Sequence, residues 1–305
     1  MCKLKKARFL RNNKVKDNIT AYAFLSPAIV LYTLFIGGPV IATVVLSLFK
    51  YNLLVSPQFV GLQNFKILFS DPLTWQVIGN TMLFTAVLVP IHVIIGLLLA
   101  SLVSHERNPF LKYIYRTSVY FPSILTTASV AVAWYYMFNY DYGVFNWILK
   151  SIGLESIPWL TSPRWVVLTI SLFSLWKFVG TPFLYYLIGL QNIPSGYYDA
   201  AKIDGANGIQ TFFRITLPLL SPTMFFVITI TIINTFQIFD EPYIITHGGP
   251  GNATKTLALY IYEKSFKSYE MGFSSAVAFC LFIIVFIFTA IQLALQKKWV
   301  TYDYE

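Results

Sequence analysis

The chain has 305 residues, of which 56% are hydrophobic and 18% aromatic, while only 11% are charged. A soluble domain carries about a quarter charged residues, and the mean hydropathy here is +0.63, so the composition excludes an ordinary soluble protein and indicates one polytopic membrane unit. The net charge of +9 is explained below by the placement of the basic residues, without nucleic-acid binding.

Continuous apolar runs predict the membrane-spanning segments. A helix needs about 20 mostly apolar residues to cross a bilayer. Six runs meet this requirement: 21–49, 77–103, 114–138, 165–190, 219–239 and 272–295. The runs do not alternate, which excludes barrel strands, and the first exceeds a signal-peptide core and is interpreted as a retained helix. The sequence therefore predicts an all-α membrane protein with six transmembrane helices.

Basic residues are distributed unevenly between the two sides that six spans create. The side with both termini and the loops after the second and fourth spans holds 14 of the 22 basic residues, and the other side holds seven. Because basic residues accumulate in cytoplasmic loops, both termini are expected in the cytoplasm. The basic segment 1–20 then acts as a topology determinant that touches anionic lipid, and the tail 299–305 is cytoplasmic.

The fourth span contains two residues that stand out in an apolar setting. It reads SLWKFVGTPF, with Trp176 next to Lys177. Ionisable residues inside a membrane are functional candidates by default. The position of Lys177 within the span predicts that its ammonium reaches polar groups such as Gln237 or snorkels toward the interface.

The cytoplasmic loop after the fourth span is the most structured polar segment of the chain. Residues 197–222 read YYDAAKIDGANGIQTFFRITLPLLSP, which predicts two short helices around a glycine turn. Ser195 is expected to start the first helix, Gly205 to supply the turn, Asn207 with Gln210 to form a capping box, and Pro218 to end the second helix. Such a loop is typical of a docking surface.

This loop resembles the signature loop of ABC importer permeases, in which Glu-Ala-Ala is followed by Asp-Gly-Ala and then by Phe, Ile and Leu-Pro. The matching residues are Asp199, Ala200, Ala201, Asp204, Gly205, Ala206, Phe213, Ile215, Leu217 and Pro218. The one departure is Asp199 in place of Glu, which keeps the charge. The resemblance implies that the segment 191–217 contacts an ATPase subunit.

Short motifs in the outer loops extend the resemblance to the sugar-importing branch, which includes the maltose- and glycerol-phosphate-type permeases. They are the runs 61–65 (GLQNF), 80–81 (NT), 157–160 (IPWL) and 247–250 (HGGP). The resemblance covers the chain from about residue 21. It implies the ABC type I importer permease fold over 21–298, in a multi-pass protein of the bacterial cytoplasmic membrane.

Partners follow from the same resemblance. It implies a homologous second permease, a dimer of ABC ATPase subunits that bind ATP and Mg²⁺, and an extracellular or periplasmic solute-binding protein that delivers the sugar. No cofactor is expected in this chain, and no nucleic acid. We expect a non-catalytic subunit, because no nucleophile, metal or acid–base constellation stands out in the spans.

Polar residues near the end of the fifth span predict a substrate contact. The segment reads INTFQIFDEPY, and Asn234, Gln237 and Glu241 recur at helical spacing, next to Asp240. A polar helix face inside a membrane should line protein or water rather than lipid. With Trp176 and Lys177, these four residues are the candidate sugar contacts; hydrogen bonding between helices is the alternative.

Three other sequence features give only weak indications of function. The run 249–256 approaches a P-loop, but Thr254 replaces the second glycine and the run lies on the outer side. Cys2 and Cys280 cannot pair plausibly, and no metal-binding spacing exists. A lone His92 in the second span favours a hydrogen bond within the bundle over a functional site.

An ion-coupled secondary transporter is the alternative function, and such a protein would be expected to have carboxylates at mid-membrane.

Overall fold

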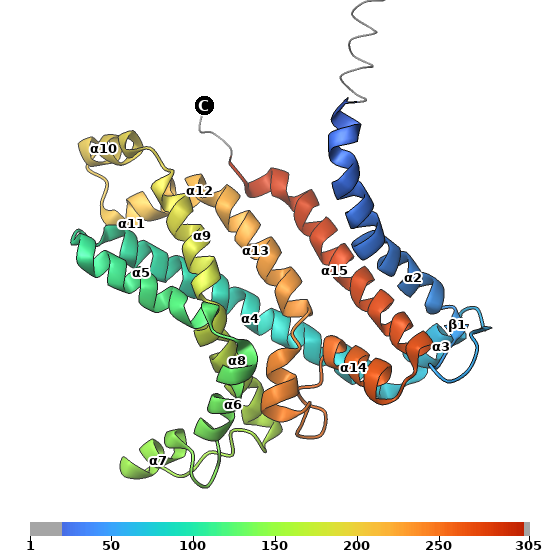
Figure 1. Cartoon of the computed structure of the whole chain (residues 1–305). Helices are drawn as coiled ribbons and strands as arrows, with labels where there is room; N and C mark the ends of the chain where they lie inside the picture. Colours follow the sequence, from blue (N-terminus) through green and yellow to red (C-terminus); the bar gives the residue numbers. More distant parts are fainter. Residues whose placement is uncertain (1–19, 302–305) are drawn as a thin grey trace, which may run out of the picture.

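The computed structural model describes residues 20–301, which are almost entirely helical (Figure 1). One two-stranded antiparallel ribbon, β1 (Phe49–Lys50) with β2 (Gln58–Phe59), interrupts the helices. The helical elements are Thr20–Leu46, which contains η1 (Thr33–Gly37) and α2 (Gly38–Leu46), α3 (Gln63–Ser70), α4 (Pro72–His105), α5 (Pro109–Ile124), α6 (Thr127–Met137), α7 (Val144–Ser151), α8 (Pro163–Phe178), α9 (Gly180–Gln191), α10 (Ser195–Ile203), α11 (Gly208–Thr211), η2 (Phe212–Thr216), α12 (Leu217–Leu219), α13 (Ser221–Phe236), η3 (Pro242–Thr246), α14 (Leu257–Tyr262), η4 (Glu263–Lys267) and α15 (Met271–Trp299).

Three helices are long and apolar enough to cross a membrane by themselves. They are Thr20–Leu46, α4 and α15, with mean hydropathies of 2.3, 2.6 and 2.7 over their most apolar windows. Two bent pairs raise the number to five: α8 with α9, bent by 45°, and Gly208–Leu219 with α13, bent by 67°. The predicted run 114–138 is divided between α5 and α6 and does not count by this criterion.

Prolines lie close to three breaks or bends in the helices. Pro122 lies in the last turn of α5, Pro182 follows the α8–α9 junction and Pro222 follows the bend into α13. A proline has no N–H for the carbonyl four residues earlier, and its ring crowds that carbonyl. Pro90, by contrast, lies inside the unbroken α4, so a proline alone does not determine where a helix divides.

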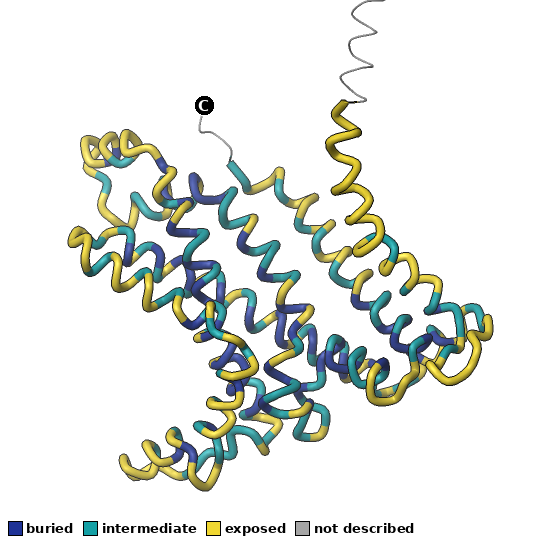
Figure 2. The backbone as a smooth tube through the Cα atoms, in the orientation of Figure 1, coloured by how far each residue is buried: buried dark blue, intermediate teal, exposed yellow. Residues whose placement is uncertain are grey.

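The core lies where α4 packs along α9 and α13. Gly96 of α4 permits the close approach, because a Cβ there would lie 2.8 Å from the Cβ of Pro182, and small residues let membrane helices approach closely. Figure 2 shows buried residues concentrated on α4, α8, α9 and α13. The helix Thr20–Leu46 is exposed along its length, and none of its most apolar window is buried in this chain.

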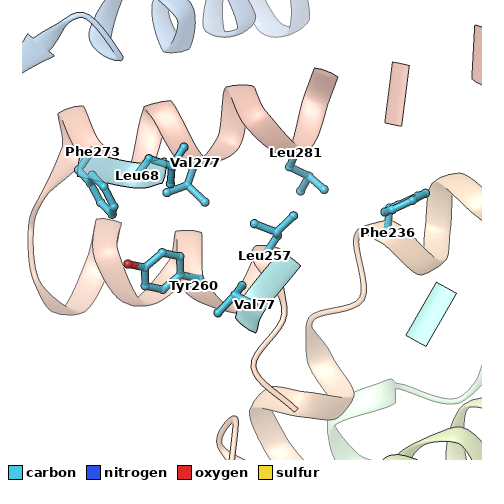
Figure 3. Packing of buried hydrophobic residues seen from close by; sticks show 8 residues of the cluster. All are labelled: Leu68, Val77, Phe236, Leu257, Tyr260, Phe273, Val277 and Leu281. Carbon is cyan, nitrogen blue, oxygen red and sulfur yellow. The ribbon is translucent and has the colours of Figure 1, made fainter. Parts of the chain in front are cut away.

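A second hydrophobic cluster joins α15 to the outer elements (Figure 3). Its buried members come from α3, α4, the end of α13, α14 and α15, and they are Leu68, Val77, Phe236, Leu257, Tyr260, Phe273, Val277 and Leu281. The cluster therefore fixes the segment after α13 against the last helix, which positions the cavity described below.

Two asparagines of the short sequence motifs, Asn64 in α3 and Asn80 in α4, donate side-chain hydrogen bonds to backbone carbonyls of neighbouring segments. The Asn64 side-chain amide donates to the carbonyls of Ser47 and Phe49, at 2.8 and 2.9 Å, and so ties the ribbon to α3. Asn80 donates to the carbonyls of Asn252 and Lys255, at 2.7 and 2.9 Å. These motif residues thus satisfy buried backbone groups, which an irregular loop cannot leave unpaired.

Candidate functional site

The glycine turn predicted in the loop after the fourth span is confirmed. Helix α10 begins at Ser195, as predicted, and ends in a Schellman motif: Ala206 N–H donates to the Ala201 carbonyl at 2.9 Å and Gly205 N–H to the Lys202 carbonyl at 3.1 Å. Gly205 has φ of +73°, a left-handed conformation that costs other L-residues free energy. A residue with a Cβ would be strained here even though the space around it is open.

The predicted capping box is also present. Asn207 accepts from Gln210 N–H at 2.8 Å, and the Gln210 side chain accepts from Asn207 N–H at 2.9 Å. The second helix passes through η2 and α12 and ends at Leu219, one residue beyond the predicted Pro218. The π-helical turn before Pro218 already departs from the α-helical hydrogen-bond pattern, so the missing N–H interrupts little.

The loop presents apolar side chains outward. Ile203 is 86% exposed, Ile209 72% and Phe213 61%. Among the signature residues, Ala201 is buried beneath α10, whereas Ala200 and Asp204 are exposed. Asp199 pairs with Lys202 at 3.2 Å, with both side chains largely in solvent. We call this surface, α10 to α12 with its connecting turn, the α10–α12 face.

A cavity of about 540 Å³ lies between α4, the α8–α9 pair and α13. Asn234, Gln237 and Glu241, which the sequence predicts on one helix face, all line it, and so does the neighbouring Asp240. The continuous helix behind that prediction is wrong, because α13 ends at Phe236 and Gln237 is its C-cap. All four residues line the same cavity even though the irregular turn 237–239 separates α13 from Asp240 and Glu241.

Open hydrogen-bonding capacity distinguishes this wall of the cavity. Asn234, Gln237 and Asp240 are exposed to it, and their side chains make no hydrogen bond to any other described residue. Glu241 is only 4% exposed. Polar groups in a membrane protein either bond one another or contact water or ligand, so these groups are available to a polar ligand.

Trp176 and Lys177 are placed elsewhere and do not line this cavity. The Trp176 ring lies 5.4 Å from that of Trp134 on α6. Lys177 is 1% exposed, and its Nζ donates to the carbonyls of Pro122 at 2.9 Å and Ser123 at 3.1 Å. The expected contact of Lys177 with Gln237 or with the interface is therefore wrong: the lysine satisfies carbonyls freed where α5 ends.

Other lining residues were not predicted from the sequence. They include Ser174, Thr181, Tyr185 and Thr231. His92 also lines the cavity, and its Nε2 lies 3.1 Å from the Ser174 carbonyl, which confirms the predicted hydrogen bond within the bundle. These residues come from four helices, α4, α8, α9 and α13, and only their tertiary packing places them together.

The P-loop-like run is confirmed as a decoy, because its side chains are used within the protein. Thr254 is fully buried and donates to the Gly249 carbonyl at 2.8 Å. Lys255 pairs with Glu263 at 2.9 Å. Within residues 20–301 no cluster of three or more His, Cys, Asp or Glu could hold a metal ion. Cys2 lies outside the described residues.

Comparisons with known proteins identify the family. Residues 92–301 match the family described as binding-protein-dependent transport system inner membrane component. The chain is 37% identical to the probable ABC transporter permease protein YesP of Bacillus subtilis, covering 98% of this chain and 96% of that protein. It is 36% identical to the sulfoquinovosyl glycerol transport system permease protein SmoG of Agrobacterium fabrum, covering 95% and 94%. This chain is a permease of the sugar-importing branch of that family. It is thus a non-catalytic, multi-pass subunit of an ABC importer.

Solved structures agree on the fold. A bacterial ABC transporter that imports the acidic polysaccharide alginate superposes with a TM-score of 0.83 at 22% identity, covering 94% of this chain and 98% of that chain. A second structure of the alginate transporter, in complex with an alginate pentasaccharide-bound periplasmic protein, gives 0.81 at 20% identity and covers 94% and 96%. At this identity the match establishes the permease's all-helical importer fold, not its cargo.

Proposed function

We propose that this permease carries a sugar or oligosaccharide through the cavity lined by Asn234, Gln237, Asp240 and Glu241. The observation that carries the proposal is the polar wall itself: four hydrogen-bonding side chains within eight residues line a cavity of about 540 Å³. Hydroxyl-rich cargo needs such groups, since each buried polar atom must find a partner. Trp176 and Lys177 do not line this cavity and are not part of the proposed sugar contacts.

The α10–α12 face is proposed as the contact with an ATPase subunit. Its exposed Ile203, Ile209 and Phe213 are apolar anchors of the kind that interfaces bury at their centres. Ala200 allows close approach, Asp199 and Asp204 supply charge at the rim, and Gly205 with Ala206 sets the angle between the two helices. Closure of the ATPase subunits would reach the spans through the 67° junction at Leu220.

The arrangement in the membrane follows from six spans, with α5 and α6 together forming the third. The proposed domains are the basic segment 1–20, the transmembrane domain 21–298 with its coupling loop 191–217, and the tail 299–305. The chain's 14-to-7 asymmetry of basic residues supports a cytoplasmic position for both termini and the α10–α12 face. In Figure 1, the described ends of the chain and α10–α12 lie at one end of the molecule, and η3 and α7 at the other.

The complete importer would add a second permease, two ATPase subunits that bind ATP and Mg²⁺, and an external solute-binding protein. A periplasmic protein holds the saccharide in one of the alginate transporter structures. Here such a protein would dock across the outer loops, including 246–256, and favour the outward-open state because it binds that state better.

Stepwise reconstitution tests the proposal. Vesicles containing this chain alone, or this chain with the ATPase, should take up none of a panel of mono- and oligosaccharides. Addition of the second permease and the binding protein, with ATP and Mg²⁺, should start uptake of one of them. Uptake driven by an ion gradient in vesicles with this chain alone would instead establish a secondary transporter.

A further inference from the structure

The charged side chains of the cavity all have one sign. Asp240 and Glu241 line it, and no lysine or arginine does within the described residues. Asp240 is exposed to the cavity, whereas Glu241 is 4% exposed and so largely withdrawn from water. Carboxylates in such a setting interact with other charges more strongly than they would in bulk water.

The nearby cation offsets part of this charge without contacting a ligand. Lys177 interacts electrostatically with Glu241, but its Nζ donates to the carbonyls of Pro122 and Ser123. Its side chain is fully buried behind the wall and is absent from the lining. A ligand in the cavity therefore contacts carboxylates and not the ammonium group, and the exposed Asp240 supplies most of the negative charge that Lys177 leaves uncompensated.

The other polar groups of the lining suit an uncharged or basic ligand. The amides of Asn234 and Gln237 and the hydroxyls of Thr181 and Tyr185 can donate to or accept from sugar hydroxyls. None supplies the fixed positive charge that a carboxylate or sulfonate would require once it left water.

We propose that Asp240 and Glu241 make this cavity a charge filter, so that the permease passes uncharged or amine-bearing saccharides and rejects anionic ones such as uronic-acid oligosaccharides. This inference rests on the proposed role of the cavity as the sugar path. The alginate importer shares the fold yet handles an acidic polysaccharide, so cargo charge must be set by lining residues and not by the helical scaffold.

Paired thiol reagents of opposite charge measure the potential in the cavity directly. The complete transporter, with Cys2→Ser and Cys280→Ser, would carry Asn234→Cys in permeabilised membranes, where reagents enter from both sides. Rates of reaction with a cationic and an anionic methanethiosulfonate are each divided by the rate with a free thiol. We expect the normalised cationic rate to exceed the anionic rate at least about tenfold, equivalent to about 1.4 kcal/mol.

Two charge-neutral variants give the deciding comparison. Asp240→Asn and Glu241→Gln, introduced separately, should each move the normalised ratio toward one. A matched control with Ser56→Cys, on the exposed outer loop, should show no change of its own ratio in either variant. A ratio of one in the parent protein, or a ratio that neither variant changes, overturns the charge filter while leaving the cavity as the path. Failure of both reagents to reach Asn234→Cys would overturn the proposed path and the filter with it.

Discussion

The α10–α12 face and the cavity differ in how their geometry arises. In the α10–α12 face, the deciding hydrogen bonds join residues at most five positions apart, such as Ala206 to Ala201 and Asn207 to Gln210. The cavity combines Leu88 and His92 of α4 with residues 227–241, which lie well over a hundred positions further along the chain. A docking surface can thus be specified by local chemistry, whereas a transport cavity requires the packed bundle.

Gly205→Val should break the local geometry most severely. A β-branched residue at φ of +73° forces the Schellman turn open. We expect ATP-driven uptake to fall at least about thirtyfold, which corresponds to about 2 kcal/mol, with normal insertion in the membrane. Gly79→Val is the control: it lies in α4, away from the α10–α12 face, has open space for a Cβ and lacks a positive φ, so it should retain uptake. Wild-type uptake by Gly205→Val would contradict the assignment of the loop.

Lys177→Met should break the packing that supports the cavity wall. Removal of the ammonium leaves the carbonyls of Pro122 and Ser123 without their donor, next to the junction of α5 and α6. We expect the assembled transporter to lose about 2 kcal/mol of stability, read as a lower melting temperature. Lys177→Gln, which keeps a donor, should lose less. Equal melting temperatures for wild type and Lys177→Met would show that the carbonyls find other partners.

Ile203→Asp should separate the role of the α10–α12 face from that of the bundle, because it changes the surface of this face without changing the packing of the helices. The side chain is 86% exposed, so we expect an unchanged melting temperature for the permease. Burial of a carboxylate in an apolar interface should weaken binding of the ATPase subunit about tenfold. Ile152→Asp, at an exposed position of the outer loop, serves as the control. Full ATPase affinity in Ile203→Asp would place the docking surface elsewhere.

Asp199→Asn should have the smallest effect. The Asp199–Lys202 pair is exposed at both ends, and such pairs contribute between zero and about 1 kcal/mol. We expect a melting temperature within error of wild type and uptake reduced by less than about twofold. A loss as large as that of Gly205→Val would mean that the carboxylate itself pairs with a basic residue of the ATPase.

The sequence predicted the helices and caps correctly where interactions between residues close in the chain determine the structure. Apolar runs located the helices 20–46, 72–105 and 271–299 to within a few residues, and Asn207 with Gln210 identified a real cap. Breaks within helices were harder to predict, because Pro90 is accommodated within α4 whereas Pro182 lies just after a 45° bend. That difference depends on what neighbouring helices offer the freed carbonyls.

The residues that line the cavity could likewise be predicted only in part from the sequence. Asn234, Gln237, Asp240 and Glu241 were identified because polar residues in an apolar run are conspicuous. Tyr185 and Thr231 were not, since nothing in their local sequence separates lining residues from buried ones. Trp176 was also singled out because it stands out, next to Lys177, in an apolar span, yet its ring packs on Trp134. Which way a helix face points is a tertiary property.

Uptake and ATP hydrolysis measured in the same proteoliposomes test the central claim most directly, with Gln237→Ala compared to wild type and to Trp176→Ala. Gln237 lines the cavity and Trp176 does not. The account predicts that Gln237→Ala lowers sugar uptake about fivefold through loss of one hydrogen-bonding group, that basal ATP hydrolysis survives, and that Trp176→Ala has the smaller effect on uptake. Wild-type uptake in Gln237→Ala, at equal amounts of assembled transporter, would contradict the assignment of this cavity as the sugar path.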